Sequence, residues 1–146
     1  MKSKIIIAGL GSGKVEELTL GVLKALEQAE HVILRTARHG IAFFLKEKGI
    51  SFDSLDDIYE SSDTFDGLYP EMIKRIKDAA DKGNLVLGVP GHPLIGERLT
   101  FELLKALKNS GYEIEILPGI SSASSFLASI ARGSIEGIKI LTAPEL

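Results

Sequence analysis

The sequence predicts an α/β fold in which a mainly parallel sheet is flanked by helices. Short β-branched runs, such as KIIIA at residues 4–8, alternate with longer segments whose apolar residues recur at helical spacing. Strands that alternate with helices are typical of parallel sheets, because a crossover helix must join each pair of strands. Three predicted strands also end in a glycine-containing turn that leads into a helix. These patterns predict a ligand site at the carboxyl ends of the strands.

The first part of the chain predicts two strands and two helices. Lys4–Ala8 is continuously apolar after its first residue, as expected of a strand buried on both faces. Apolar residues three and four positions apart predict a helix over Glu16–Gln28. A short apolar run predicts a strand at His31–Leu34, and a helix with one apolar side is expected at Gly40–Lys48.

The middle of the chain begins with its weakest pattern. Two short strands are expected there, at residues 51–52 and 57–59. Helical spacing returns over Leu68–Lys82, and the apolar run Asn84–Val89 predicts a strand that ends at PGHP. A helix is expected over Ile95–Asn109, because the following Ser-Gly is a natural stop.

The last part of the chain predicts two strands around one helix. Glu113–Leu117 alternates polar and apolar residues and ends at Pro-Gly, which indicates a strand. Small residues over Ser121–Ala131 predict a helix capped by Ser121. A further strand is expected at Gly137–Leu141.

Three turns are therefore expected at one edge of the sheet, at Gly9–Gly13, Pro90–Gly96 and Pro118–Ser122. Glycine allows a backbone to approach a ligand closely, and each turn leads into a helix N-terminus that offers N–H donors. One such turn is ordinary, but three at one edge favour a binding site over mere tight turns.

The opening loop GLGSGK fails both common nucleotide-binding patterns. A P-loop ending at Gly13 and Lys14 would require glycine at Ala8 and a hydroxyl at Val15. A dinucleotide fingerprint starting at Gly9 would require glycine at Lys14, and no acidic residue closes the second strand. Lys14 is expected at the solvated start of a helix, and nucleotide binding through it stays as a third reading of the domain.

Composition excludes several other classes of function. The net charge is −3 without a basic run, so a duplex nucleic-acid partner is not expected. The absence of cysteine and the presence of only three histidines argue against a zinc or iron–sulfur site and exclude disulfides, and we expect no metal ligands. No segment approaches the roughly 20 apolar residues of a membrane span. We expect a cytoplasmic domain with no membrane partner.

Three longer motifs carry a family resemblance. GLGSGKVEELTLGVLKAL at residue 9 resembles the opening "GxGPGDPxxLTxxAxxxL" of the tetrapyrrole (corrin/porphyrin) methylases. LVLGVPGHPLIGERLTFELL at residue 85 resembles that family's strand and "GDPxxxG" turn. YEIEILPGISSASSFLASI at residue 112 is similar to its "PGISS" turn and helix. The motifs have the right order and spacing and cover almost the whole chain.

The resemblance implies a bilobal methyltransferase that folds S-adenosylmethionine (SAM) into the cleft between two α/β domains. It implies that Gly91 and Gly119 approach SAM through their backbones. The residues that it assigns to SAM are Leu10, Pro90, Gly91, His92, Pro93, Ile95, Gly96, Pro118, Gly119, Ile120, Ser121 and Ser122. Those that it assigns to the border of a substrate cavity are Gly11, Ser12, Gly13 and Lys14. It identifies no catalytic side chain.

The chain departs from the family pattern in its first two motifs. The acidic residue of the first loop is replaced by Lys14, and the Asp of the GDP turn is replaced by His92. Methyl transfer is therefore less certain than SAM binding. PGHP, LRTARH and SFDSLDDIYE look closest to the methylase-like domain of proteins fused to a MazG-type nucleotide pyrophosphohydrolase. A binding or regulatory module without methyl transfer is the main alternative.

The resemblance also sets expectations for the chain's organisation and partners. Residues 1–133 should form the N-terminal domain, and residues 134–146 a linker and the first strand of an incomplete second domain. We expect a homodimer, a small-molecule acceptor such as a tetrapyrrole, and no methyl transfer by this chain alone. Arg35, Arg38 and His39 follow the second strand, where a solvated loop is expected and contact with an anionic substrate is the alternative.

Overall fold

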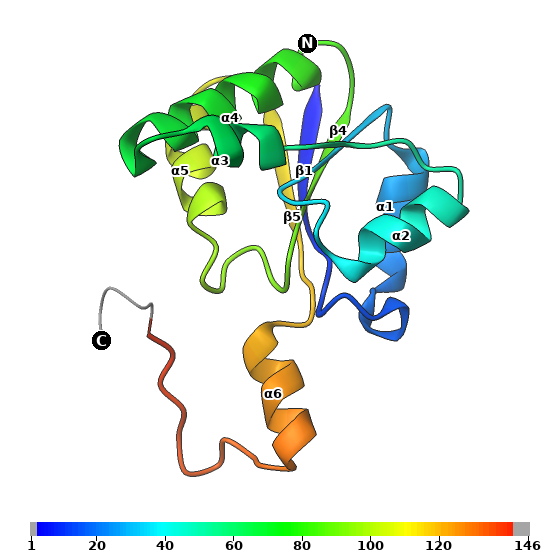
Figure 1. Cartoon of the computed structure of the whole chain (residues 1–146), viewed down its shortest axis with the longest axis vertical. Coiled ribbons are helices and arrows are strands. Elements are labelled where there is room, and N and C mark those ends of the chain that lie inside the picture. Colours follow the sequence, from blue (N-terminus) through cyan, green and yellow to red (C-terminus); the bar gives the residue numbers. More distant parts are fainter. Residues whose placement is uncertain (1–2, 142–146) are drawn as a thin grey trace.

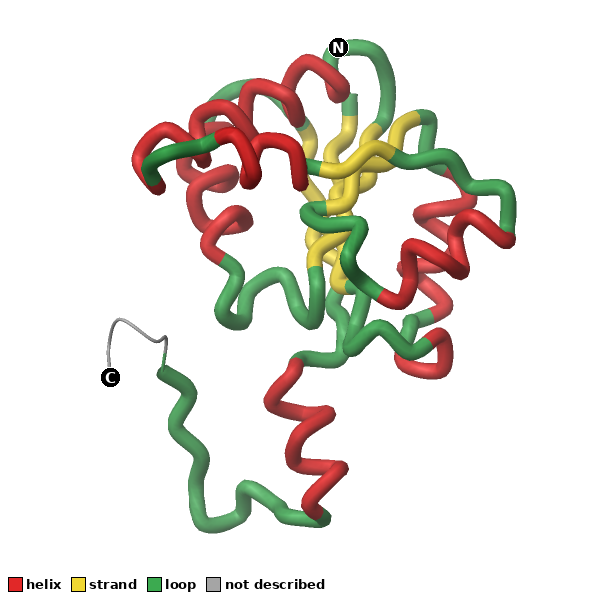
Figure 2. Tube along the Cα trace, viewed as in Figure 1, coloured by secondary structure: helices red, strands yellow, loops and turns green. Residues whose placement is uncertain are grey.

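A five-stranded parallel sheet runs through the middle of the molecule, with helices on both faces (Figures 1 and 2). The computed structural model describes residues 3–141. The strands follow the order β3-β2-β4-β1-β5, and every pairing is parallel. They are β1 (Lys4–Gly9), β2 (His31–Leu34), β3 (Asp53–Ser54), β4 (Leu85–Val89) and β5 (Glu113–Leu117). The predicted fold class is confirmed.

The sequence of β1 suits a strand with neighbours on both sides and helices on both faces. Ile5 lies opposite Leu85 of β4 and Ile114 of β5. Ile5 and Ile7 are fully buried and belong to the core on one face, whereas Ala8 belongs to the core on the other. A continuous apolar run is therefore required here, because neither face of the strand meets water.

Five helices cover the two faces of the sheet (Figure 1). The core on one face contains residues of α1 (Leu20–Gln28) and α2 (Gly40–Glu47). The core on the other face contains residues of α3 (Asp56–Ser61), α4 (Phe65–Ala80) and α5 (Arg98–Leu107). Among residues 3–141 no helix has the length and apolar character needed to cross a membrane.

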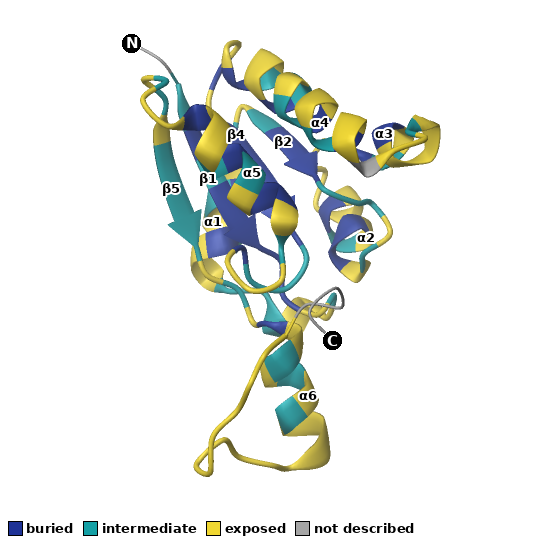
Figure 3. Cartoon of the chain, turned by 90° about the vertical axis from the view of Figure 1, so that its left-hand side faces the viewer, coloured by how far each residue is buried: buried dark blue, intermediate teal, exposed yellow. Residues whose placement is uncertain are grey.

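A sixth helix, α6 (Ser122–Ile130), extends away from the carboxyl edge of the sheet (Figure 1). It contains no buried residue, and Figure 3 colours its ribbon as exposed or intermediate. Ser121 caps it by accepting a hydrogen bond from Ser124 N, as predicted. Residues 131–141 are exposed beyond it, and 142–146 lie outside the described part of the chain.

Three of the sequence-based expectations are wrong. Residues 57–59 belong to helix α3 rather than to a strand, because Leu55 and Ile58 have the i, i+3 spacing that buries one side of a helical turn. The neighbouring strand lies at 53–54 instead of 51–52. No strand forms at 137–141, where the described residues are exposed and lie outside the sheet.

A fourth expectation, the first helix, is only partly right. The predicted helix at 16–28 is divided into a short 3-10 turn, η1 (Val15–Glu17), and α1. The division falls at Thr19, whose side chain accepts a hydrogen bond from Val22 N and so caps α1.

Candidate functional site at the carboxyl edge of the sheet

The three predicted turns meet at one edge, as expected, and their glycines touch one another. A Cβ atom on Gly9 would lie 2.5 Å from Gly91 O and 2.6 Å from Gly119 N. A Cβ atom on Gly119 would lie 2.3 Å from Gly91 O. These glycines are therefore required by the packing of backbone against backbone, whether or not a ligand is bound.

Paired backbone hydrogen bonds join the turns after β1 and β4. Gly91 N donates to Gly11 O at 2.8 Å, and Gly11 N donates to Gly91 O at 3.2 Å. Leu10 N donates to Val89 O at 2.8 Å, and the Leu10 side chain is fully buried in the core. Gly91 has a φ of +67°, which favours glycine, and its missing Cβ would face Ser121 and Ser122.

His39 fixes the loop after β2 to the opening loop. Its Nδ1 accepts a hydrogen bond from Ile41 N at 3.3 Å and so caps α2. The proton is then inferred to lie on Nε2, which donates to Gly11 O at 3.1 Å. Burial of the imidazole lowers the pKa of His39, with a smaller lowering from Arg35, although the bond to Gly11 raises it. A neutral imidazole therefore joins two loops of the site.

The rest of the opening loop packs on α2. A Cβ atom on Gly40 would lie 2.2 Å from Gly13 O, so the two backbones are in close contact. Lys14 is exposed and precedes η1, in agreement with a solvated start of a helix. The opening loop thus serves to position its neighbours.

A cavity of about 400 Å³, here called the loop-edge cavity, lies where these loops meet α6. Its volume falls within the range of about 300–1,000 Å³ that is usual for small-molecule sites. Its lining residues are Gly11, Ser12, Arg35, His39, Pro90, Gly91, His92, Ile95, Gly96, Glu97, Ser122 and Ser125.

The structure brings eight of the sequence-predicted site residues into this lining: Gly11, Ser12, Pro90, Gly91, His92, Ile95, Gly96 and Ser122. It places the other eight outside it: Leu10, Gly13, Lys14, Pro93, Pro118, Gly119, Ile120 and Ser121. Leu10, Pro93 and Ser121 are buried, so their side chains support the loops. Ligand contact by any of the sixteen stays a prediction.

Sequence reasoning missed Glu97 and Ser125 as lining residues and placed Arg35 and His39 in a solvated loop. Instead, Arg35 Nε lies 3.1 Å from Glu97 Oε2, and the two side chains are only 26% and 10% exposed. Burial raises the pKa of Glu97, whereas the charge of Arg35 lowers it. Glu97 Oε1 also accepts a hydrogen bond from Leu99 N, which caps α5. The sequence shows Arg35 at a strand end and Glu97 near a helix start, but it does not show that the two side chains meet.

His92, at the position where the family pattern has an aspartate, stabilises the turn after β4. Its Nδ1 accepts a hydrogen bond from Leu94 N at 3.0 Å, two residues further on. An aspartate carboxylate makes the same contact in an Asx-turn. An imidazole can thus make this contact too, and it lines the cavity at this point.

Glu17 connects the opening loop to α6. Its Oε2 accepts a hydrogen bond from Ser125 Oγ at 3.2 Å. Hydrogen bonding from Ser12, and to a smaller extent from Ser125, lowers the pKa of Glu17, although partial burial opposes this. The wall of the cavity formed by α6 is thus held by a polar contact.

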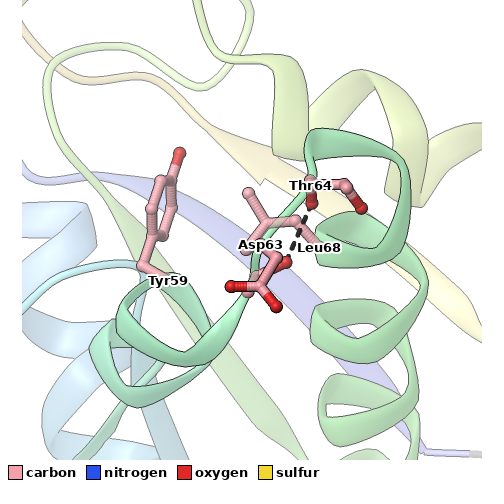
Figure 4. Close-up of a pocket in the computed structure, with 5 residues that line it drawn as sticks. Tyr59, Asp63, Thr64 and Leu68 are labelled. Atoms are coloured by element: carbon pink, nitrogen blue, oxygen red, sulfur yellow. Dashed lines mark hydrogen bonds between the residues drawn. The ribbon is translucent and has the colours of Figure 1, made fainter.

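A second, smaller pocket lies at the turn between α3 and α4 (Figure 4). It has about 150 Å³ and is lined by Tyr59, Ser62, Asp63, Thr64 and Leu68. Ser62 Oγ donates to Thr64 O at 2.8 Å, so two of its polar groups already bond to each other. This pocket is made by one stretch of chain and is too small for most cofactors. We take the loop-edge cavity as the candidate site.

Comparison with known proteins places the chain in a family. Residues 4–140 match the family model of the Tetrapyrrole (Corrin/Porphyrin) Methylases. The uncharacterized protein YabN of Bacillus subtilis (strain 168) is 30% identical over 146 residues, which are 100% of this chain and 30% of that protein.

Two solved structures have the same fold. The cobalt precorrin-4 methyltransferase CbiF is 26% identical, with a TM-score of 0.68, and 90% of this chain covers 52% of it. The uroporphyrin-III-C-methyltransferase of Thermus thermophilus is 26% identical, with a TM-score of 0.64, and 92% of this chain covers 55% of it. The chain thus spans about half of these structures and less than a third of YabN. With a family match from the first strand to beyond α6, this chain belongs to the SAM-dependent tetrapyrrole methylase family.

Proposed function

We propose that this chain is the N-terminal part of a SAM-dependent methyltransferase and that its loop-edge cavity holds part of SAM. The observation that carries the proposal is the junction of Gly9, Gly91 and Gly119, which brings three backbone turns around one cavity of about 400 Å³. Membership of the methylase family supports the choice of cofactor.

The lining residues suit a zwitterionic cofactor with an uncharged nucleoside. The backbones of Gly91, Gly96 and Ser122 line the cavity, and Ile95 lines it beside them with an apolar side chain. SAM supplies an already activated methyl group when bound, so the protein's main tasks are to orient the acceptor and to exclude water. SAM would be held by the turns Pro90–Gly96 and Pro118–Ser122. The methyl acceptor would be bordered by Gly11–Lys14.

The wall formed by α6 is incomplete in this chain. Phe126 is 62% exposed and Ile130 is 46% exposed, on a helix without buried residues. Exposed apolar side chains of this kind mark a surface that another part of the protein or another copy covers. We propose that a second domain and a second copy of the chain complete the cleft. This chain alone should then bind SAM weakly and transfer no methyl group.

A second candidate function is a SAM- or ligand-binding regulatory module attached to a MazG-type nucleotide pyrophosphohydrolase. It is favoured by Lys14 and His92, which replace two aspartates of the methylase pattern. Binding of SAM without turnover, in a complete protein offered tetrapyrrole acceptors, would support this alternative. Turnover would support the first.

Calorimetry with SAM, S-adenosylhomocysteine and ATP tests the proposal on this chain. We expect both adenosyl compounds to bind, even if weakly, and ATP not to bind. Ile95→Arg should abolish binding, because Ile95 lines the cavity. Leu94→Arg is the matched control. Leu94 directly precedes Ile95, its side chain is 58% exposed, and it lies outside the lining. Equal binding of ATP and SAM, or unchanged SAM binding in Ile95→Arg, would overturn the proposal.

A further inference from the structure

Arg35 occupies an unusual position between two cavities. It is the first residue after β2, and its backbone N donates to Gly88 O at 2.9 Å, which fixes it to β4. Its side chain lines the loop-edge cavity and also an adjoining cavity of about 220 Å³. Arg35 thus borders both spaces.

The contact with Glu97 leaves the donors of Arg35 unused. Arg35 Nε is buried and makes no hydrogen bond, although the Glu97 carboxylate lies 3.1 Å away as an ion-pair partner. Within residues 3–141, neither terminal amino group of Arg35 has a hydrogen-bond partner. An arginine has five N–H donors, and buried donors are normally satisfied. The terminal amino groups are therefore open to solvent and free to bond an acceptor that enters the cavity.

The surroundings of Arg35 favour a negatively charged acceptor. Helices α2, α5 and α6 begin beside the cavity, and His39, Glu97 and Ser122 at these N-termini line it. Helix N-termini carry partial positive charge. Glu97 is the only acidic residue in the described lining, and Arg35 balances its charge. Each of these helices already has a side-chain cap, so a second anion would meet the positive ends of the helices and the guanidinium of Arg35.

We propose that Arg35 anchors a carboxylate-binding subsite in the loop-edge cavity, and that Glu97 is the positioning residue that holds the guanidinium there. The two terminal amino groups of an arginine match the two oxygens of a carboxylate. The inference rests on the proposed function, because it assumes that the cavity holds SAM and its acceptor. The carboxylate belongs either to the methionine end of SAM or to the acceptor.

Calorimetry with three probes distinguishes the two sources. Arg35→Gln should weaken SAM binding at least tenfold and leave decarboxylated SAM unaffected if Arg35 holds the cofactor's carboxylate. If it holds the acceptor's carboxylate, binding of uroporphyrin III, a polycarboxylate, should weaken tenfold while SAM binding stays unchanged. Arg98→Gln is the matched control. Arg98 is the first residue of α5, its side chain is 66% exposed, and it pairs with Glu102. Unchanged binding of every probe by Arg35→Gln would overturn the proposal.

A second measurement needs no variant and no binding of SAM. Sodium malonate, a small dicarboxylate, is titrated against the parent chain at constant ionic strength while the Arg35 Nε–H signal is followed by nitrogen-15 NMR. We expect this signal to move and saturate, and the Arg98 Nε–H signal to stay in place. A stationary Arg35 signal would overturn the subsite even if SAM binds. A saturating shift without any SAM binding would support the subsite and contradict the proposed function.

The combined variant Arg35→Gln/Glu97→Gln keeps the proposal testable if Arg35→Gln does not fold. It removes both charges together, so no buried charge is left without its partner. If Arg35→Gln fails to fold, the combined variant takes its place in the calorimetry with the same expected results. Glu97→Gln alone should weaken carboxylate binding less than Arg35→Gln does, because it loosens the guanidinium without removing it. An equal or larger loss would contradict the positioning role of Glu97.

Discussion

At the scale of single residues, His39 couples protonation to the geometry of the site. Its folded pKa is lowered mainly by burial, so the unfolded chain takes up the proton first as the pH falls below about 6.5. Stability contributed by the neutral imidazole is therefore present at neutral pH and is lost as the pH falls toward the folded pKa. Protonation would also remove the cap that Nδ1 provides to Ile41 N.

We predict that His39→Asn lowers the free energy of unfolding by about 1 kcal/mol at pH 7.5, because the bond to Gly11 O is lost. Asparagine still caps helices, so α2 should persist. Urea unfolding at pH 7.5 and at pH 5.5 gives the comparison. Between pH 7.5 and pH 5.5 the free energy of unfolding should fall less in the variant than in the parent. An equal fall in both would contradict the assignment of His39 as the titrating group.

Gly119 allows two backbone turns to pack closely against each other. Because a Cβ atom would lie 2.3 Å from Gly91 O, Gly119→Ala should destabilise the fold by about 3 kcal/mol or separate the turns. Gly133→Ala is the control, since its Cβ would meet nothing within 4 Å. Urea denaturation checks both variants. A Gly119→Ala chain as stable as the control would show that the three-turn junction is looser than described.

At the scale of elements, α6 is the least supported helix. It has no buried residue, and it is held at its first turn by the Ser121 cap and the bond between Ser125 and Glu17. Elements with few buried contacts open at low free energy. We predict that the amides of α6 exchange with solvent at least tenfold faster than those of β4, whose residues are all buried. Comparable protection in hydrogen exchange would mean that α6 is already covered, as in a dimer.

The elements also show what the sequence was able to predict. β1 and β4 were recognised because they are buried on both faces and read as continuous apolar runs, and the three turns were recognised by their glycines. Residues 57–59 were misassigned because a six-residue helix is too short to display its periodicity. The missing strand at 137–141 shows that apolar residues alone do not form a strand without a neighbouring strand to pair with.

The site was predictable only in its backbone part. Glycine turns at strand ends are local patterns, whereas the pairing of Arg35 with Glu97 joins residues far apart in sequence through the neighbouring positions of β2 and β4. Strand order was not predicted, so this contact was out of reach. The same reason explains why Leu10 and Gly119 were expected to face a ligand, although packing between strand ends occupies them.

At the scale of the whole molecule, the central claim is that SAM is held at the carboxyl edge of the sheet. Chemical-shift mapping of the parent chain by NMR during titration with SAM tests it most directly. We predict saturating shifts at Gly11, Gly91, Gly96 and Ser122, which line the loop-edge cavity. Saturating shifts confined to the α3–α4 pocket, at Tyr59–Leu68, with none at the four lining residues, would contradict the claim.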